Sequence, residues 1–454
     1  MQLYRTEFSQ LAKLALPLVV TQLAQMSMSV ADTVMAGRVS SADLAGVALG
    51  TTVFWPLLFL VAGTTMAITP TVAQLRGSDE SEKSGEVVRQ AMWASLVGGI
   101  VLFFVFRNLM PLYQFVGVDP QALPITKAYL DAMSWGVVPV LMYFCLRYMS
   151  EGLGWTIPAM LISFSALLFK IPLNYWFIHG GFGVTAMGGE GCGWSTAIVM
   201  CYQFTAMAAV IHFSRLKSAG LFANFSWPDL PAIGRLIGLG APIGLSTFAE
   251  FSIFSAMTLL IGRLGIETLA AHQIASNIGA LSYMVPMALG MAASIRVGFN
   301  VGKGDFAAAR LSGWVAIFTS LAFAFVVAAL LISFNEFIAS LYTTQNEVLL
   351  LASELLLLVA IYRPFDDVQA TALGTLRGFK DTRVPFYVAI CAYWLVGFPV
   401  ALVLGFGSIA SLDLGVYGYW VGLIVGLIVA SGVLVARFQY LAKRPDKVQQ
   451  FAMR

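Results

Sequence analysis

The stretch LSGWVAIFTSLAFAFVVAALLISFN, residues 311–335, contains no charged side chain and is long enough to cross a lipid bilayer as a helix. The hydrocarbon core of a bilayer is about 30 Å thick, and roughly 20 apolar helical residues span it. Of the 454 residues, 59% are apolar and 11% are charged, whereas about a quarter are charged in an ordinary soluble domain. The composition therefore predicts an integral membrane protein.

Apolar windows of this kind recur along the whole chain. Other charge-free windows cover residues 44–75, 191–214, 236–262, 384–412 and 414–436. With the windows that one or a few charges interrupt, the sequence predicts twelve spans, which start near residues 12, 44, 87, 126, 154, 191, 236, 267, 309, 347, 384 and 414. These windows are too long for barrel strands, and a lipid-facing backbone must satisfy its own hydrogen bonds. The predicted fold class is all-α, with the first span retained because no short signal segment precedes it.

The positive charges gather on one side of the predicted spans. With twelve spans, the termini and the even-numbered turns share one side, which holds 20 of the 26 Lys and Arg residues. The opposite side holds Arg38, Arg107, Lys127 and Arg263. Since cytoplasmic loops carry the excess of Lys and Arg, we expect both termini in the cytoplasm. The net charge of +3 is too small to indicate a nucleic-acid partner.

The second half of the chain repeats the first. An offset of 225 residues pairs Pro17 with Pro242 and Pro139 with Pro364, and an offset of 227 pairs Gly188 with Gly415 further along. The repeat predicts two six-helix bundles related by a pseudo-two-fold axis along the membrane normal. The expected lobes are residues 1–213 and 232–454, joined by a cytoplasmic linker at 214–231, whose polar composition is typical of a connecting segment.

A few charged side chains fall inside the predicted spans, where an ionised group costs at least about 2.5 to 3.5 kcal/mol. These residues are Asp32, Lys170, Glu250, Arg363, Asp366 and Asp367. Because residues four apart share a helix face, we expect Arg363 to pair with Asp367 and to leave Asp366 free for function. A buried carboxylate can take up a proton, and one with oxygen neighbours can hold a hard cation. Acids in this setting favour a protein that binds and releases cations.

The sequence offers no sign of metal or redox chemistry from cysteine. The four cysteines have no CxxC spacing, and we expect them to be small buried apolar residues. The many aromatic and methionine side chains suit contact with flat lipophilic cations, although most of them must face lipid or the protein core.

Five segments resemble one transporter family. They are ALPLVVTQLAQMSMSVADTVMAG (15–37), KIPLNYWFIHGGFG (170–183), GAPIGLSTFAEFSIF (240–254), AAHQIASNIGALSYMVPMALGMAASIRVG (270–298) and IYRPFDDVQATALGTLRGFKD (361–381). The chain resembles multidrug and toxic compound extrusion (MATE) transporters of the NorM group over essentially its whole length. The resemblance implies a two-lobed exporter in the bacterial inner membrane, active as a monomer and not an enzyme. It would exchange protons or sodium ions for cationic drugs and dyes, and so contribute to antibiotic resistance.

The same resemblance implies roles for individual residues. Asp32 matches the acid of the N-lobe cavity, with Gln25 as its polar neighbour, and Asn174 matches the second polar position of its motif. The first polar position, commonly asparagine, is Lys170 here. A lysine at this place could pair with Asp32 and occupy the place of a cation, or titrate beside it.

In the C-lobe, the resemblance implies that Glu250 and Asp366 bind the coupling cation and that Tyr362 is their partner. The three residues would be the metal ligands if the coupling ion is sodium. No resident cofactor is implied. His272 is compatible with the family pattern, and we expect it to pack in the core.

Other functions fit the sequence less well. A flippase for a lipid-linked precursor or polysaccharide would need a phosphate-binding cavity rich in Arg and Lys, whereas acids outnumber bases within the spans. An intramembrane prenyltransferase would need an aspartate-rich magnesium motif, and Asp366 and Asp367 have no third acid at the required spacing. A passive channel is disfavoured because the two repeats carry unequal acids.

Overall fold

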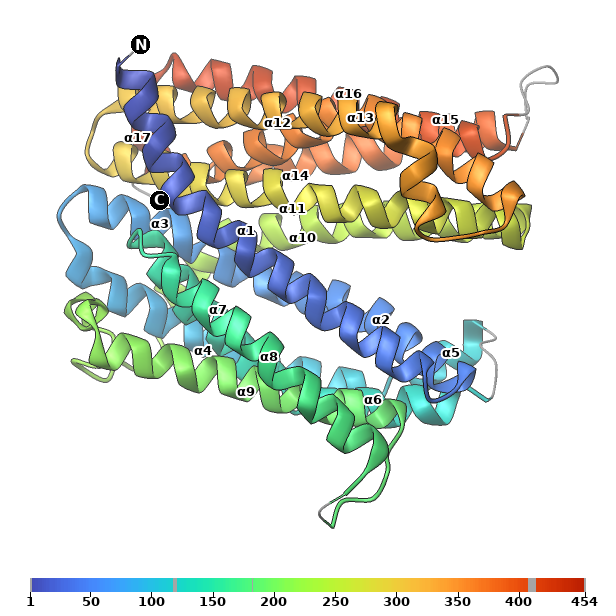
Figure 1. Ribbon diagram of the computed structural model, residues 1–454. Helices are drawn as coiled ribbons and strands as arrows, with labels where there is room; N and C mark the ends of the chain where they lie inside the picture. Colours follow the sequence, from blue (N-terminus) through green and yellow to red (C-terminus); the bar gives the residue numbers. More distant parts are fainter. Residues whose placement is uncertain (1, 117–120, 182, 407–413, 453–454) are drawn as a thin grey trace. The chain divides into compact units, whose positions relative to one another are not determined.

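The computed structural model describes residues 2–116, 121–181, 183–406 and 414–452, and these residues are helical apart from turns, loops and one isolated β-bridge between Gly181 and Val184 (Figure 1). In the first half the helices are α1 (Gln2–Gly37), α2 (Ser41–Met66), α3 (Ile68–Gly77), α4 (Ser84–Arg107), α5 (Met110–Val116), α6 (Leu123–Ser134), α7 (Val137–Gly152), α8 (Ile157–His179) and α9 (Gly189–Phe213). In the second half they are α10 (Leu230–Ile261), α11 (Ile266–Gly302), α12 (Phe306–Ser340), α13 (Asn346–Gly378), α14 (Arg383–Ala389), α15 (Phe398–Gly405), α16 (Val416–Ala442) and α17 (Pro445–Ala452). A π-helical segment, Ile390–Gly397, joins α14 to α15, and short 3₁₀ turns lie at Ser81–Lys83, Arg215–Ala219 and Gly262–Leu264.

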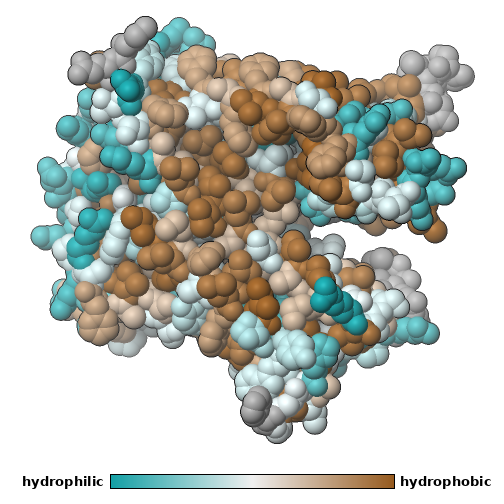
Figure 2. All heavy atoms as spheres, in the orientation of Figure 1, coloured by the Kyte–Doolittle hydropathy of each residue, from teal (hydrophilic) through white to brown (hydrophobic). Residues whose placement is uncertain are grey.

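Helices of membrane-spanning length and hydropathy account for most of the described residues. Eleven helical segments qualify as candidate spans, and α6 with α7 makes a twelfth if this pair, bent by 48°, is one span. The structure thus confirms an all-helical membrane fold with eleven to twelve candidate spans, and the predicted twelve are reached when the bent pair counts as one. On the face in Figure 2, hydrophobic residues cover the middle stretches of the helices and hydrophilic residues gather toward their ends. This distribution is the one that a surrounding bilayer requires.

The chain forms two compact units. One unit contains Pro17–Gly244, and the other contains Met1–Leu16 together with Leu245–Arg454. The boundaries fall inside α1 and α10, at Pro17 in the first and two residues after Pro242 in the second. The lobes predicted from the repeat differ from these units only in where the two helices are assigned, and the lobe division remains a prediction.

The repeat is visible in the backbone. Gly188 precedes α9 with φ 57° and ψ −133°, and Gly415 precedes α16 with φ 51° and ψ −126°. This conformation is open to glycine and strained for other residues, so the same residue type occurs at both places for the same reason. Lys380 and Gly154 also follow equivalent helices, α13 and α7, and both have a positive φ, of 58° and 76°.

The segment 214–231 is hydrogen-bonded to α4, which lies in the same compact unit. Arg89 on α4 donates to the carbonyl oxygens of Gly220 and Leu221 at 2.6 and 2.9 Å and to Ser226 Oγ at 2.7 Å. Gln90 accepts from the Asp229 backbone N–H at 2.8 Å. The predicted linker is therefore a docked segment.

The start of α1 is fastened within the other unit. The carboxylate of Glu7 accepts two hydrogen bonds from Arg296 on α11, at 2.8 and 2.6 Å, and a third from Ser312 on α12 at 2.6 Å. A bidentate arginine–carboxylate pair of this kind fixes orientation as well as distance.

Two of the four cysteines differ from expectation. Cys145 and Cys192 are buried, but Cys201 and Cys391 are exposed, so the prediction that all four are buried is wrong for the latter pair. A small apolar thiol on the outer surface of a membrane helix faces lipid rather than water, which removes the pressure to bury it.

Candidate functional site

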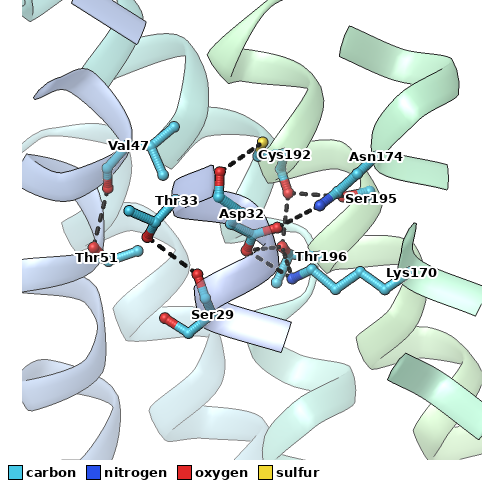
Figure 3. Close-up of polar contacts among 10 residues, drawn as sticks. All are labelled: Ser29, Asp32, Thr33, Val47, Thr51, Lys170, Asn174, Cys192, Ser195 and Thr196. Atoms are coloured by element: carbon cyan, nitrogen blue, oxygen red, sulfur yellow. Dashed lines mark hydrogen bonds and ion pairs between the residues drawn. The ribbon is translucent and has the colours of Figure 1, made fainter. Parts of the chain in front are cut away.

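Asp32 is the acid around which polar side chains of the first half converge (Figure 3). Lys170 Nζ on α8 donates to Asp32 Oδ2 at 2.7 Å, and Asn174 Nδ2 donates to Asp32 Oδ1 at 2.7 Å. The same lysine amine donates to Thr196 Oγ1 on α9 at 2.8 Å. All four side chains are buried. Protein donors have thus replaced water at both carboxylate oxygens.

The helix period explains how two short motifs build this cluster. Lys170 and Asn174 are four residues apart on α8 and so project from one face. On α9, the hydroxyl of Thr196 donates to the Cys192 carbonyl at 2.7 Å, which leaves its oxygen able to accept from the lysine. Ser195 Oγ donates to Asn174 Oδ1, which fixes the amide with its nitrogen toward Asp32. The possibility that Lys170 pairs with Asp32 is therefore confirmed.

Gln25, predicted as the polar neighbour of Asp32, is not among the hydrogen-bond partners of that acid in the described part of the chain. The buried glutamine of α1 is instead Gln22, which accepts from Arg147 Nη2 at 3.2 Å. Gln25, three residues further along α1, is only partly buried.

A second buried ion pair in this unit was not anticipated from the sequence. Arg147 Nε on α7 donates to Glu151 Oε1 at 2.6 Å, and the two side chains are 2% and 0% exposed. Both residues lie close to a predicted turn, a position that is typical of a cytoplasmic charge. The four-residue spacing of an arginine and a glutamate was the available signal.

In the second half, one arginine on α13 serves two acids. Arg363 Nη1 lies 3.0 Å from Asp366 Oδ2, and Nη2 forms an ion pair with Asp367 Oδ1. The predicted pair of Arg363 with Asp367 is confirmed, but the expectation that it leaves Asp366 free is wrong. Positions three and four residues along a helix are both neighbours of the first, so one guanidinium reaches both carboxylates. The arginine is 0% exposed.

Glu250 on α10 lies in the same unit and belongs to the same electrostatic cluster. It is within hydrogen-bonding reach of Gln369 and Tyr283, and it is close enough to Asp366 for the two carboxylates to repel each other when ionised. Glu250, Gln369 and Ser246 line a small cavity. The oxygen atom Oε1 of Gln369 has no hydrogen-bond partner among the described residues.

This cavity is lined by the kinds of oxygen ligand that bind hard cations. Carboxylate, amide carbonyl and hydroxyl oxygens are the ligands that such cations prefer, and Glu250, Gln369 and Ser246 supply one of each. Gln369 was missed in the sequence, although its position three residues after Asp366 places it near that acid. Within the described residues, no group of three or more His, Cys, Asp and Glu side chains could hold a metal ion.

Tyr362 is buried close to the acids and next to Arg363. Its ring stacks on Trp420 with centroids 6.0 Å apart. Its hydroxyl lies beside Gly279, where an added Cβ would come within 2.5 Å of that oxygen. Its predicted role as a cation ligand stays a prediction.

His272 is also buried against Trp420, with its Nε2 3.0 Å from Thr258 Oγ1. These contacts agree with the packing role that we expect.

The family model described as MatE matches the chain twice, at residues 17–176 and 242–403. The two matches begin 225 residues apart and end 227 apart, which are the two offsets that the sequence repeat predicts.

Relatives match the chain over nearly its full length. Multidrug resistance protein MdtK of Yersinia pseudotuberculosis is 40% identical over 447 residues, 98% of each chain, and MdtK of Yersinia enterocolitica is 39% identical over 448 residues, again 98% of each. Among solved structures, the eukaryotic MATE transporter AtDTX14 superposes with a TM-score of 0.89 at 21% identity, covering 99% of this chain and 100% of that one. Vibrio cholerae MATE transporter VcmN in its bent form gives 0.87 at 17% identity, covering 99% and 100%. The chain therefore belongs to the MATE family of membrane transporters.

Proposed function

We propose that this transporter exports lipophilic organic cations, including drugs and dyes, by antiport with an inorganic cation, either a proton or sodium. The carrying observation is the group of carboxylates in the second unit, where Asp366 and Asp367 share the guanidinium of Arg363 and Glu250 lies close to Asp366. The name multidrug resistance protein on relatives that are 40% identical over the whole chain supports this function.

The proposed coupling is competition for these carboxylates. Three acids near two arginines, Arg363 and Arg377, leave one unbalanced negative charge when all are ionised, and a buried charge without a partner is costly. Binding of one cation removes this cost, so the cluster favours occupancy by some positive guest. An organic cation and an inorganic one that use the same carboxylate exclude each other, and inward movement of the inorganic ion is driven by the membrane potential, about 2.3 kcal/mol per charge per 100 mV.

The second unit supplies the proposed exchange site. Glu250 and Asp366 hold the exchanged cation, Gln369 adds an oxygen ligand, and Tyr362 lies beside the site. Arg363 with Asp367 sets the charge of the cluster. Sodium would be held through Glu250, Asp366 and the neighbouring oxygens, with no resident cofactor.

The first unit supplies a second acid with a different role. Asp32, Lys170 and Asn174 form a polar centre that responds to cations. Gln25 lies on α1, as Asp32 does, one turn from the buried Gln22. We further propose that the protein works as a monomer in a bacterial cytoplasmic membrane with both termini inside. The excess of Lys and Arg on that side of the predicted spans supports this orientation.

The test is transport of a fluorescent organic cation in inside-out vesicles, with a pH gradient and a sodium gradient imposed separately. Coupled transport of the dye is expected with one gradient and is expected to disappear in Glu250→Gln and Asp366→Asn. Glu336→Gln, the same chemical change at an exposed position of α12, is the matched control and is expected to behave as the parent. Unimpaired transport in both acid variants would overturn the assignment.

A further inference from the structure

The Lys170 ammonium occupies a place lined by oxygen atoms from two other helices. Its nitrogen lies 2.7 Å from Asp32 Oδ2 on α1 and 2.8 Å from Thr196 Oγ1 on α9. Thr196 Oγ1 is itself 3.4 Å from the same carboxylate oxygen, so the carboxylate and the hydroxyl face one point together. Figure 3 shows the lysine chain extending from α8 to this point.

The oxygen set is the kind that binds a small hard cation when no lysine is present. Carboxylate and hydroxyl oxygens are hard ligands, and Asp32 and Thr196 are buried at 4% and 5% exposure, where water competes little for an ion. A lysine ammonium is a compact point charge with three donors and no acceptor. Its positive charge balances the negative charge of the Asp32 carboxylate, as an inorganic cation would.

A second cation at this carboxylate would lie beside the lysine ammonium and be repelled by it. Asp32 Oδ1 already accepts from Asn174, which leaves Oδ2 as the oxygen that faces the cation position. A tethered amine pays no translational entropy to stay there, whereas a dissolved ion does. The lysine therefore holds the position against a monovalent ion.

We propose that Lys170 is a built-in cation that fills the site at Asp32 and excludes sodium from the first half of the transporter. The specificity of this half is set by one side chain, and its removal exposes a sodium site made by Asp32 and Thr196. Only the consequence for transport, that inorganic-ion coupling is confined to Glu250 and Asp366, rests on the proposed function.

The test measures binding of ²²Na⁺ to the purified full-length chain in detergent, by equilibrium dialysis against choline. All samples carry Glu250→Gln and Asp366→Asn, so that the acids of the second half do not contribute. Lys170→Met is expected to create saturable sodium binding that the further change Asp32→Asn removes. The background with Lys170 intact is expected to show none. Because efflux is not measured, failure of the proposed antiport would not affect this result.

Two control variants separate charge from side-chain size. Lys170→Arg keeps a fixed positive charge and is expected to bind no sodium, and Lys127→Met makes the same change at an exposed lysine of α6 and is expected to bind none. Lys170→Asn, which keeps an amide donor, is the second neutral variant. Circular dichroism and gel filtration establish folding of each protein.

Either of two outcomes overturns the proposal. One is saturable sodium binding in the background with Lys170 intact that Asp32→Asn abolishes, since the lysine would then not exclude the ion. The other is absence of sodium binding in both folded neutral variants, since no hidden site would then exist. Should neither neutral variant fold, the comparison of the Lys170 background with and without Asp32→Asn decides the question.

Discussion

The two halves of the repeat differ in how many positive partners their buried acids have. Around Asp32, one carboxylate meets one lysine, and each of its oxygens accepts a hydrogen bond. Around Arg363, one guanidinium serves Asp366 and Asp367 while Glu250 adds a third carboxylate nearby. Both halves thus bury acids, but in the second half three carboxylates lie near two arginines, Arg363 and Arg377. The half with surplus carboxylates is the better place for an exchangeable cation.

The largest expected effect concerns transport. Asp366→Asn and Glu250→Gln each remove a carboxylate from the cluster with surplus charge, and we expect coupled efflux to fall at least about tenfold, the effect of losing about 1.4 kcal/mol of cation binding. Asp32→Asn removes a carboxylate that is already neutralised, and we expect a smaller loss. Initial rates of dye transport, normalised to protein in the vesicles, measure the ranking. The reverse ranking would place the exchange site in the first half.

The next effect concerns stability. Arg363→Met leaves buried carboxylates without their partner, and we expect the free energy of unfolding to fall by about 3 to 5 kcal/mol. Lys170→Met leaves a single carboxylate, which still accepts from Asn174, so its cost is expected to be smaller. Denaturant unfolding in detergent at neutral pH provides the comparison.

A second mutation checks the origin of that effect. Asp367→Asn in the Arg363→Met background removes one unpaired charge, and we expect part of the lost stability to return. No recovery would mean that Arg363 acts through packing rather than charge.

A smaller effect distinguishes the two equivalent glycines. An added Cβ at Gly188 would lie 2.7 Å from Asp43 Oδ1, whereas at Gly415 no atom of the described chain lies within 4 Å. Both substitutions to alanine carry backbone strain, about 1 to 3 kcal/mol, but only Gly188→Ala also displaces Asp43 from its 2.6 Å hydrogen bond with the Gly189 N–H. We therefore expect Gly188→Ala to lower the unfolding midpoint more than Gly415→Ala. Equal shifts would show that backbone strain alone matters.

The smallest expected effect is a pH dependence outside the spans. Burial lowers the pKa of Lys380, between α13 and α14, to about 8. Between this value and the ordinary one of about 10.4, the unfolded chain retains the proton that the folded chain has released, so stability rises with pH across this window. Lys380→Met is expected to flatten this rise, measured as unfolding midpoints from pH 7.5 to 10. The same rise in the variant would assign it to another group.

Much of the fold and part of the site could be predicted from the sequence. Long charge-free windows directly indicate segments that lie in lipid. Gly and Pro residues at equivalent positions of the repeat, such as Pro17 and Pro242, indicate a backbone geometry that few other residues adopt. Rare acids within spans, such as Asp32, are conspicuous because of their cost. These signals do not depend on how helices pack.

The remaining contacts depend on side-chain direction and on neighbours far away in sequence. Arg147 was assigned to a turn because its charge lies near the end of a window, and only packing reveals that Glu151 keeps it buried. The sharing of Arg363 between two acids depends on rotamers, and so does the choice of Gln22 over Gln25 as the buried residue. An uncharged residue such as Gln369 lacks the energetic cost of an ionised group within a span, so it does not stand out in the sequence.

The unit boundaries inside α1 and α10 bear on whether half of this protein could exist alone. Residues Met1–Leu16 belong with the second half, where Glu7 binds Arg296, while the first part of α10, up to Gly244, belongs with the first half. Each compact unit thus contains the first segment of the first helix of the other half. A gene cut at 214–231 would encode two fragments that each lack a segment of their own compact unit, so we expect neither fragment to fold into a complete unit alone.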